Sequence, residues 1–136
     1  MRNLLKTIHT HLCRNRDLVL VTVIASSGAT PRGAGARMLV GKEGRICGTI
    51  GGGAVEYRSE QIAARVLEEK TSLGHDFTLT KDDVQNLGMI CGGACNVFFH
   101  YIPAGDEHTI MLCEMAEEQF RKGTALWLLT CVGENG

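Results

Sequence analysis

Two cysteines separated by three residues stand beside a pair of glycines in the segment MICGGACN, residues 89–96. Cys91 and Cys95 have the spacing of half a zinc site, but no second Cys or His pair completes four ligands at the usual intervals, so zinc is not expected. The spacing also differs from the CxxC of thioredoxin-like proteins, which argues against a dithiol redox site. What remains is Cys91 on a glycine loop, available to a soft metal or a sulfur-bearing ligand, whereas Cys95 is expected in the core.

A second glycine cluster, GTIGGGAVE at residues 48–56, leads from a predicted strand into a predicted helix. Gly51, Gly52 and Gly53 have no Cβ atoms, so the backbone could approach a ligand closely, and the first amides of the helix favour an anionic group. The alternative is a tight turn that only glycines can make. Glu56 falls in the first helical turn, where it either complements the helix dipole or accepts two hydrogen bonds from an amino-substituted heterocycle.

A third segment, SSGATPRGAG at residues 26–35, follows the apolar run LVLVTVIA. Its glycine, proline and serine content predicts an irregular loop at the C-terminal end of a buried strand, where open sheets place ligands. Arg32 and Arg37 flank this loop and could hold a phosphate or a carboxylate, with a solvated role favoured for Arg37. The glycines lack the helix and the third glycine of a dinucleotide fingerprint, and no P-loop follows any glycine run.

The elements that must position these loops follow from hydrophobic periodicity. Helices are expected at about 4–12, from Ala54 to an end around Lys70 to Gly74, where Ser72 and Gly74 fit a stop, and at about 109–121; strands are expected at 18–25, 75–80, 96–102 and 125–132. The segments ARMLVG and RICGTI around residues 42–44 predict an antiparallel hairpin. The predicted fold class is α/β, with a mixed sheet that contains this hairpin and is flanked by about three helices, and α+β is the alternative.

The tail repeats the order of the opening segment: an amphipathic helix, a basic hinge, an apolar strand containing a threonine, and a glycine-bearing end. The shared identities are too few to establish a duplication. Residues 1–136 are expected to form one domain. The chain stops where the first copy enters its glycine-rich loop, which predicts a truncated chain.

Composition excludes several classes of function. The chain carries 14 Lys and Arg against 15 Asp and Glu, so no electrostatic footprint for nucleic acid or an anionic membrane is present. Its longest apolar run is far shorter than the roughly 20 residues that cross a bilayer, and no export signal is expected. Cys13, Cys47, Cys113 and Cys131 are scattered singly, so we expect them to be small buried hydrophobes in a reducing cytoplasm.

Taken in order, VTVIASSGATPRGAGARMLV, GTIGGGAVE, and GMICGG followed by a strand resemble the N-terminal domain of the xanthine dehydrogenase accessory protein family, XdhC/CoxI, over about residues 18–102. The resemblance implies an accessory protein, rather than an enzyme, for maturation of a molybdenum hydroxylase of the xanthine dehydrogenase type. Such a protein would bind molybdopterin, the molybdenum cofactor, and aid its sulfuration or insertion. The implied partners are the hydroxylase apo-enzyme, a sulfur-donating desulfurase and a second copy in a homo-oligomer. A C-terminal Rossmann-like domain, usual in the family, is absent from these 136 residues.

The positions that match the family's motifs form the expected cofactor-binding set. They are Ser26, Ser27, Arg32, Gly33, Gly35, Ala36, Gly51, Gly52, Gly53, Glu56, Cys91, Gly92 and Gly93. Our hypothesis gives the phosphate to backbone donors and arginine, the pterin edge to Glu56, and molybdenum or its sulfido ligand to Cys91. The family often has a bulkier or cysteine-bearing residue where Ala54 stands. Two other hypotheses stay open: an interaction or dimerisation module whose loops are only turns, and an enzyme that acts on a nucleotide or sulfur compound through Cys91.

Overall fold

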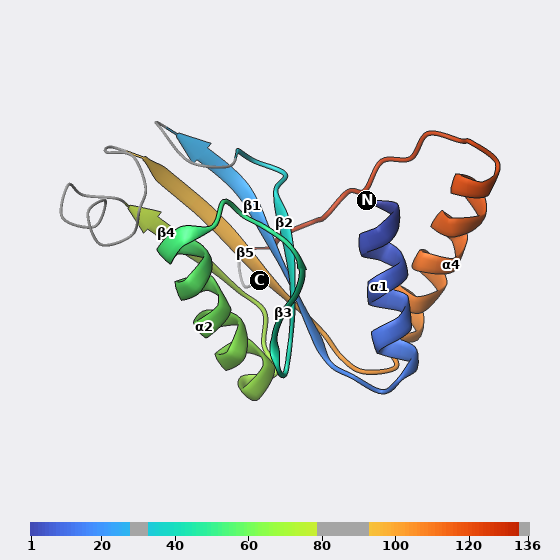
Figure 1. Ribbon diagram of the computed structural model, residues 1–136, viewed down its shortest axis with the longest axis horizontal. Coiled ribbons are helices and arrows are strands. Elements are labelled where there is room, and N and C mark those ends of the chain that lie inside the picture. The colour runs from blue at the N-terminus through green and yellow to red at the C-terminus, as the bar shows by residue number, and fades with distance from the viewer. Residues whose placement is uncertain (28–32, 79–92, 134–136) are drawn as a thin grey trace.

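The computed structural model describes residues 1–27, 33–78 and 93–133, which form one sheet and three helices (Figure 1). In chain order the elements are α1 (Arg2–Cys13), β1 (Leu18–Ser27), β2 (Arg37–Gly41), β3 (Gly44–Gly48), α2 (Gly53–Glu69), β4 (Leu73–Thr78), β5 (Ala94–Ile102) and α4 (Glu107–Arg121). The five strands lie in the order β3-β2-β1-β5-β4, and each neighbouring pair is antiparallel. The predicted combination of one sheet with about three helices is confirmed, including the hairpin (β2–β3). All five described strands are antiparallel to their neighbours, which is the arrangement typical of the α+β alternative.

The central strand β1 supplies apolar side chains to both faces of the sheet. Side chains alternate along a strand, so Val19, Val21 and Val23 join the core beneath α2, whereas Leu18 and Leu20 join a second core beneath α1. Residues 18–23 are buried on whichever face they lie, which is why this stretch shows no alternation of polar and apolar residues, with Thr22 as its one polar member.

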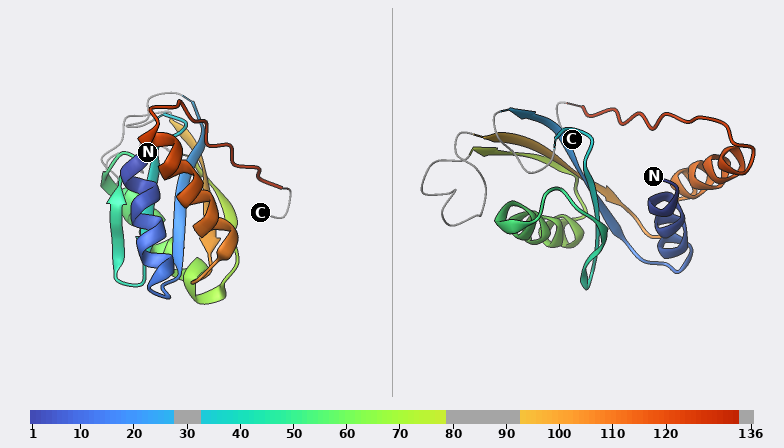
Figure 2. Two further views of the ribbon diagram at one scale, coloured as in Figure 1. Left: turned by 90° about the vertical axis from the view of Figure 1, so that its right-hand side faces the viewer. Right: turned by 45° about the horizontal axis from the view of Figure 1, so that its top comes forward.

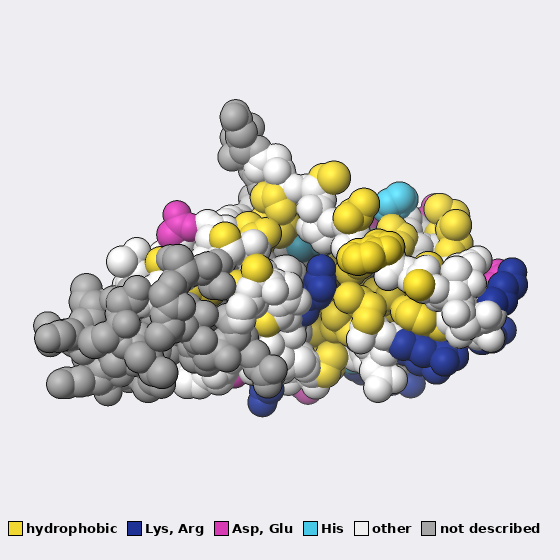
Figure 3. Space-filling model, turned by 90° about the horizontal axis from the view of Figure 1, so that it is seen from above, with side chains coloured by type: hydrophobic (Ala, Val, Ile, Leu, Met, Phe, Trp, Pro, Cys, Tyr) yellow, Lys and Arg dark blue, Asp and Glu magenta, His cyan; other side chains and the backbone are white. Residues whose placement is uncertain are grey.

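Helices cover the sheet on two sides (Figure 2). Helix α2 packs its Val55, Ala63 and Val66 against one face, as its periodicity predicts. Helices α1 and α4 pack against each other and lie over the opposite face, where Ile8 and Leu12 of α1 are buried. Seen from above, hydrophobic side chains gather over the half of the molecule that holds this helix pair (Figure 3).

Several element boundaries differ from the sequence prediction. Strand β1 continues through Ser26 and Ser27, which were expected in a loop, because pairing with β5 extends to Ala94. Helix α2 ends at Glu69, at the start of the expected range, and Lys70 adopts the left-handed conformation (φ 55°) at its C-cap. Gly74 lies in β4, and the Oγ of Ser72 accepts a hydrogen bond from the Tyr101 amide of β5.

The predicted strand 125–132 is wrong for this structure, because residues 124–133 adopt no helix or strand. Trp127 is 90% exposed and Leu129 is 85% exposed, so the segment has the residues of a strand but lacks a sheet to join. Cys13 and Cys131 are exposed rather than buried, whereas Cys113 is buried and Cys47 is half-buried. Each of the helices that the structure describes is too short or too polar to cross a membrane.

Candidate functional site

The topology brings the flanks of all three glycine segments to one end of the sheet. Strand β1 ends there at Ser27, which pairs with Ala94 at the start of β5. Strand β2 begins there at Arg37, and β3 ends beside it, with the Thr49 amide donating to the Arg37 carbonyl at 3.0 Å. The N-terminus of α2 follows only a few residues after β3. The described ends of the three predicted loops therefore converge, and we call this region the glycine end.

The glycine turn before α2 has a backbone that side chains rarely permit. Gly51, Gly52 and Gly53 have φ values of 129°, 73° and 63°. Gly52, the N-cap of α2, combines φ 73° with ψ −168°, a region that is populated almost only by glycine. Among the described residues, no side chain caps the helix at this end. The first amides of α2 consequently have neither an intrahelical partner nor a capping side chain there, which is the arrangement that binds anions.

Glu56 lies just behind this turn and is only 8% exposed. Its Oε2 accepts a hydrogen bond from Thr49 Oγ1 at 3.2 Å, and the same Oγ1 accepts one from the Gly51 amide at 3.1 Å. Thr49 thereby links the carboxylate to the glycine turn. Oε2 also lies 3.6 Å from the place where a Cβ at position 52 would stand.

The other carboxylate oxygen, Glu56 Oε1, is buried without a hydrogen-bond partner among the described residues. Arg45 of β3 brings its Nη1 to 3.8 Å, which is close enough for an ion pair but too far for a hydrogen bond. The guanidinium is shared, because it also donates to the Gly48 carbonyl at 2.9 Å and lies 3.7 Å from Glu60. A buried carboxylate oxygen without a hydrogen-bond partner can still accept a hydrogen bond from a ligand.

Arg37 is half-buried, and not the solvated side chain that was expected. Its Nη1 donates to the Gly35 carbonyl at 3.4 Å, and its buried Nε has no hydrogen-bond partner in the part of the chain that the structure describes. Gly48 must be a glycine because a Cβ there would stand 2.4 Å from the Arg37 carbonyl oxygen. The chain is thus held tightly together where β2, β3 and the glycine turn meet.

Several predicted site residues cannot be placed. Arg32, Cys91 and Gly92 lie outside the described residues, so the expected meeting of Cys91 with the glycine turn stays a prediction. Gly93 is buried and directly precedes β5, and Gly33 and Gly35 lie in the exposed approach to β2. Of the thirteen matching positions, Gly51, Gly52, Gly53 and Glu56 form the part whose geometry is most fully defined.

The sequence prediction missed Thr49, Arg45 and Ser59. Thr49 had a local signal, because a threonine two residues before Gly51 can accept a hydrogen bond from that amide. Ser59 lies three residues after Glu56, is fully buried, and has no partner for its Oγ within the described ranges. Arg45 had no local signal, since its contact with Glu56 depends on how β3 lies against α2.

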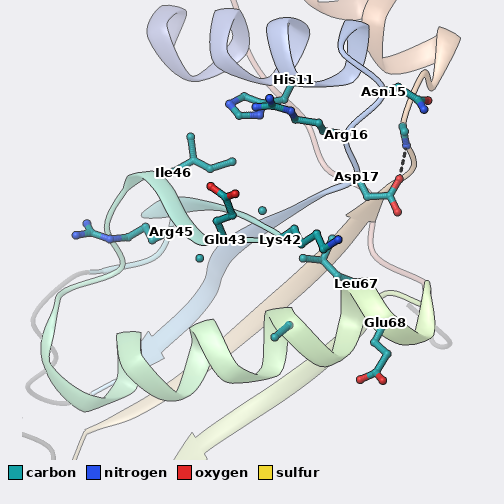
Figure 4. A pocket seen from close by; sticks show the side chains of 14 residues that line it. His11, Asn15, Arg16, Asp17, Lys42, Glu43, Arg45, Ile46, Leu67 and Glu68 are labelled. Atoms are coloured by element: carbon teal, nitrogen blue, oxygen red, sulfur yellow. Dashed lines mark hydrogen bonds between the residues drawn. The ribbon is translucent and has the colours of Figure 1, made fainter.

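A groove of about 850 Å³ lies at the opposite end of the sheet (Figure 4). The hairpin tip, the turn after α1 and the C-terminal half of α2 line it, and the predicted site residues that the structure describes lie elsewhere. Its charges are mixed: Arg16, Lys42 and Arg45 against Asp17, Glu43 and Glu68. Asp17 is already engaged, because its carboxylate accepts hydrogen bonds from the Ala104 amide at 2.8 Å and the Tyr101 hydroxyl at 2.9 Å. Because cationic and anionic side chains line the groove together, its charge favours neither an anionic nor a cationic ligand.

A smaller pocket of about 290 Å³ lies at the glycine end, between β4, β5 and the end of β1. Cys95 contributes to its wall but is otherwise buried in the core, as predicted. Burial raises the pKa of the Cys95 thiol, which disfavours the thiolate that metals and electrophiles require. Within the described ranges, no group of three or more His, Cys, Asp or Glu side chains is arranged to hold a metal ion.

Comparison with known proteins places this geometry in a family. Residues 11–78, half of the chain, match the XdhC and CoxI family. The chain belongs to the XdhC and CoxI family. The matched region runs from the end of α1 to the end of β4, so it contains the first glycine-rich segment, the glycine turn and Glu56.

Individual relatives extend this result. The chain is 34% identical over 85 residues to the uncharacterized protein YqeB of Escherichia coli K12 and 33% identical over 84 residues to a probable xanthine dehydrogenase component of Bacillus subtilis 168. Each alignment covers 62% of this chain, but only 16% and 25% of the respective relative. A crystal structure of a xanthine dehydrogenase from Bacillus halodurans shares the fold, with a TM-score of 0.70 and 24% identity over 84% of this chain and 34% of that one. The XdhC and CoxI segment seen here therefore spans about a third or less of these proteins.

Proposed function

We propose that this member of the XdhC and CoxI family is a cytoplasmic accessory protein that binds molybdopterin and aids its sulfuration or its insertion into a molybdenum hydroxylase of the xanthine dehydrogenase type. One observation carries the proposal: the N-terminus of α2, entered through three glycines with positive φ, has no capping side chain among the described residues and lies directly in front of a buried carboxylate, one oxygen of which has no hydrogen-bond partner among them. The naming of two relatives as xanthine dehydrogenase proteins supports the choice of client enzyme.

The donor and acceptor set suits the chemistry of this cofactor. When bound, molybdopterin supplies a phosphate, an amino-substituted pterin edge and two sulfur atoms that hold molybdenum. The uncapped amides at residues 52–54 favour the phosphate through the dipole of α2. Glu56 Oε1 is an acceptor that needs a donor, and the pterin edge offers N–H groups that match a carboxylate.

In this proposal the backbone of the glycine end binds the phosphate, and the carboxylate of Glu56 recognises the pterin edge. Gly52 keeps the backbone bare, since a side chain there would begin 3.6 Å from Glu56 Oε2 and would have to adopt a conformation reserved for glycine. Thr49 holds the carboxylate in place through Oε2, which leaves Oε1 for recognition. Cys91 remains the proposed contact for molybdenum or its sulfido ligand. A sulfur-donating desulfurase and the apo-enzyme are the proposed partners.

A second candidate function, an interaction or dimerisation module that binds no cofactor, is favoured by a different observation. Seven large hydrophobic side chains are exposed on α4 and the tail: Met111, Leu112, Met115, Leu126, Trp127, Leu129 and Val132. Contiguous exposed apolar surface marks protein contacts. In this case the glycine turn would serve only to connect β3 with α2.

Pterin retention separates the two functions. The purified protein is oxidised, and the fluorescence of the released pterin is compared between wild type, Glu56→Ala, Cys91→Ser and a control, Glu60→Ala. Glu60 lies on the same helix and also contacts Arg45, but it is not behind the glycine turn. We expect wild type and Glu60→Ala to retain pterin. The Glu56 and Cys91 variants should retain about 10-fold less pterin or lower, while their circular dichroism spectra stay unchanged. Retention in both variants would refute the site, and a stable wild-type protein without pterin would favour the second function.

A further inference from the structure

Alternation along β2 places Arg37 on the face of the sheet that α2 does not cover. Met38 joins the core beneath α2, whereas Leu39 joins the core beneath α1. Arg37 stands two residues before Leu39, so the two side chains leave the strand on the same face. Its partner in register on β1 is Thr22, which lies between two valines of the core beneath α2 and therefore also faces away from α2.

The chemistry of this face changes along the strands. Near α1 it is apolar, with Leu18 and Leu20 on β1 and Leu39 on β2. At the next position toward the glycine end, each of these strands has a polar residue instead, Thr22 on β1 and Arg37 on β2. Both residues are sheltered from solvent, because Thr22 is 7% exposed and Arg37 is half-buried. Polar groups at this depth are normally hydrogen-bonded, so their partners must be accounted for.

The guanidinium of Arg37 has unused donors. Its Nη1 donates to the Gly35 carbonyl at 3.4 Å, and its buried Nε has no hydrogen-bond partner among the residues that the structure describes. None of the ion pairs between described side chains includes Arg37. Asp76 of β4 lies on the same face, but Asn96 donates to it and it is three strands from β2, roughly 14 Å at about 4.8 Å per strand. Arg37 is thus a half-buried cation without a carboxylate partner in the described ranges.

A sheltered cation in this state calls for a counter-ion. Removing a charge from water costs free energy unless an opposite charge and hydrogen bonds compensate for the loss. The planar guanidinium stays protonated and matches the two oxygens of a phosphate or a carboxylate group. Thr22, at the neighbouring position, adds a hydroxyl group to the same face.

We propose that Arg37, with Thr22 beside it, forms a second oxyanion site that binds a phosphate or carboxylate group of a small ligand on the face of the sheet away from α2. This site goes beyond the proposed function, because the amides of α2 and Glu56 belong to the helix that covers the other face.

The side-chain Nε–H of Arg37 reports on this site directly in ¹⁵N–¹H spectra of the full chain. Inorganic phosphate, added at constant ionic strength, should shift its resonance and saturate, and a separate titration with acetate shows whether a carboxylate also binds. Arg58 is the control, because it is an exposed arginine of α2 whose Nε–H should not respond in a saturable way. Phosphate at the N-terminus of α2 would instead shift the backbone amides of residues 52–54, so the two sites are observed separately.

Thermal unfolding adds a measurement that a purely structural role of Arg37 would not produce. In chloride, Arg37→Gln should be at least as stable as wild type, because it removes an unpaired charge and keeps part of the aliphatic stem. In about 10 mM phosphate at the same ionic strength, the Tm of wild type should rise by roughly 2–5 °C, and that of Arg37→Gln should rise less. The substitution should weaken phosphate binding at this site about 10-fold or more, whereas Arg58→Gln should behave as wild type.

Two results would overturn this inference. One is an Arg37 Nε–H resonance that neither phosphate nor acetate shifts, even if the amides of α2 respond. The other is a phosphate-dependent rise in Tm that is equal in wild type and in Arg37→Gln. A shift at Arg37 without any response at residues 52–54 would support this site and count against the phosphate site of the proposed function, so the two proposals can fail independently.

Discussion

Replacing Gly52 by alanine tests whether the glycine turn is as constrained as its backbone indicates. A non-glycine residue at φ 73° and ψ −168° costs on the order of 1–3 kcal/mol. The new Cβ adds no clash, because its nearest neighbour would be Glu56 Oε2 at 3.6 Å, an ordinary contact. Alanine recovers about 0.4–1 kcal/mol by restricting the unfolded chain. The net loss in free energy of unfolding should be about 1–2 kcal/mol.

Urea denaturation followed by circular dichroism measures this loss, and for a chain of this size it corresponds to a fall in Tm of roughly 4–7 °C. Gly74→Ala is the control, because Gly74 is an exposed residue of β4 with an ordinary φ and nothing within 4 Å of a new Cβ. It should raise stability by about 0.4–1 kcal/mol, because alanine restricts the unfolded chain there without any cost in the folded one. Equal effects at the two positions would show that the turn is not strained for side chains, and the case for a glycine-specific site would fail.

Two further predictions concern capping and a buried hydrogen bond. Asp106 caps α4 by accepting from the Thr109 amide at 3.0 Å, so Asp106→Ala should cost about 1 kcal/mol in a denaturation experiment at pH 7, and Asp106→Asn should cost little. Hydrogen bonds from Thr109 hold the pKa of Asp106 below its ordinary value of 3.8, so the stability difference between wild type and Asp106→Asn should shrink as pH falls below that value, and a difference that does not change with pH would contradict this. Burial, together with the hydrogen bond to Asp17, raises the pKa of Tyr101 to about 12. Ultraviolet titration should show the phenol ionising near that pH, and stability should fall between about pH 10 and 12; Asp17→Asn should lower the pKa, and an unchanged pKa would refute this role for Asp17.

The sequence predicts the sheet and helices well where burial sets the pattern. Val19, Val21 and Val23 facing one core and Leu18 and Leu20 facing another make β1 recognisable without any partner in view. The helical face of α2 is equally clear. The ends of strands and helices are harder to predict. The extension of β1 to Ser27, for example, depends on pairing with Ala94, a residue far away in the chain.

The tail shows that a strand-like composition is not enough to make a strand. ALWLLTCV has the composition of a central strand, yet composition cannot supply the neighbouring strands that make one. Of the site, the glycine turn and Glu56 could be predicted from local sequence. Thr49 could have been found from its spacing to Gly51, but Arg45 could not, since its approach to Glu56 follows from the packing of α2 beside β3.

Hydrogen exchange with and without molybdopterin tests the central claim most directly, because it reports where the ligand sits on the chain. If the glycine end binds the cofactor, amides of residues 51–56 at the start of α2 should be protected on its addition, and Glu56→Ala should abolish that protection. Protection confined to residues 42–46 and 64–68, around the groove at the opposite end of the sheet, would contradict the account, as would binding that protects neither region.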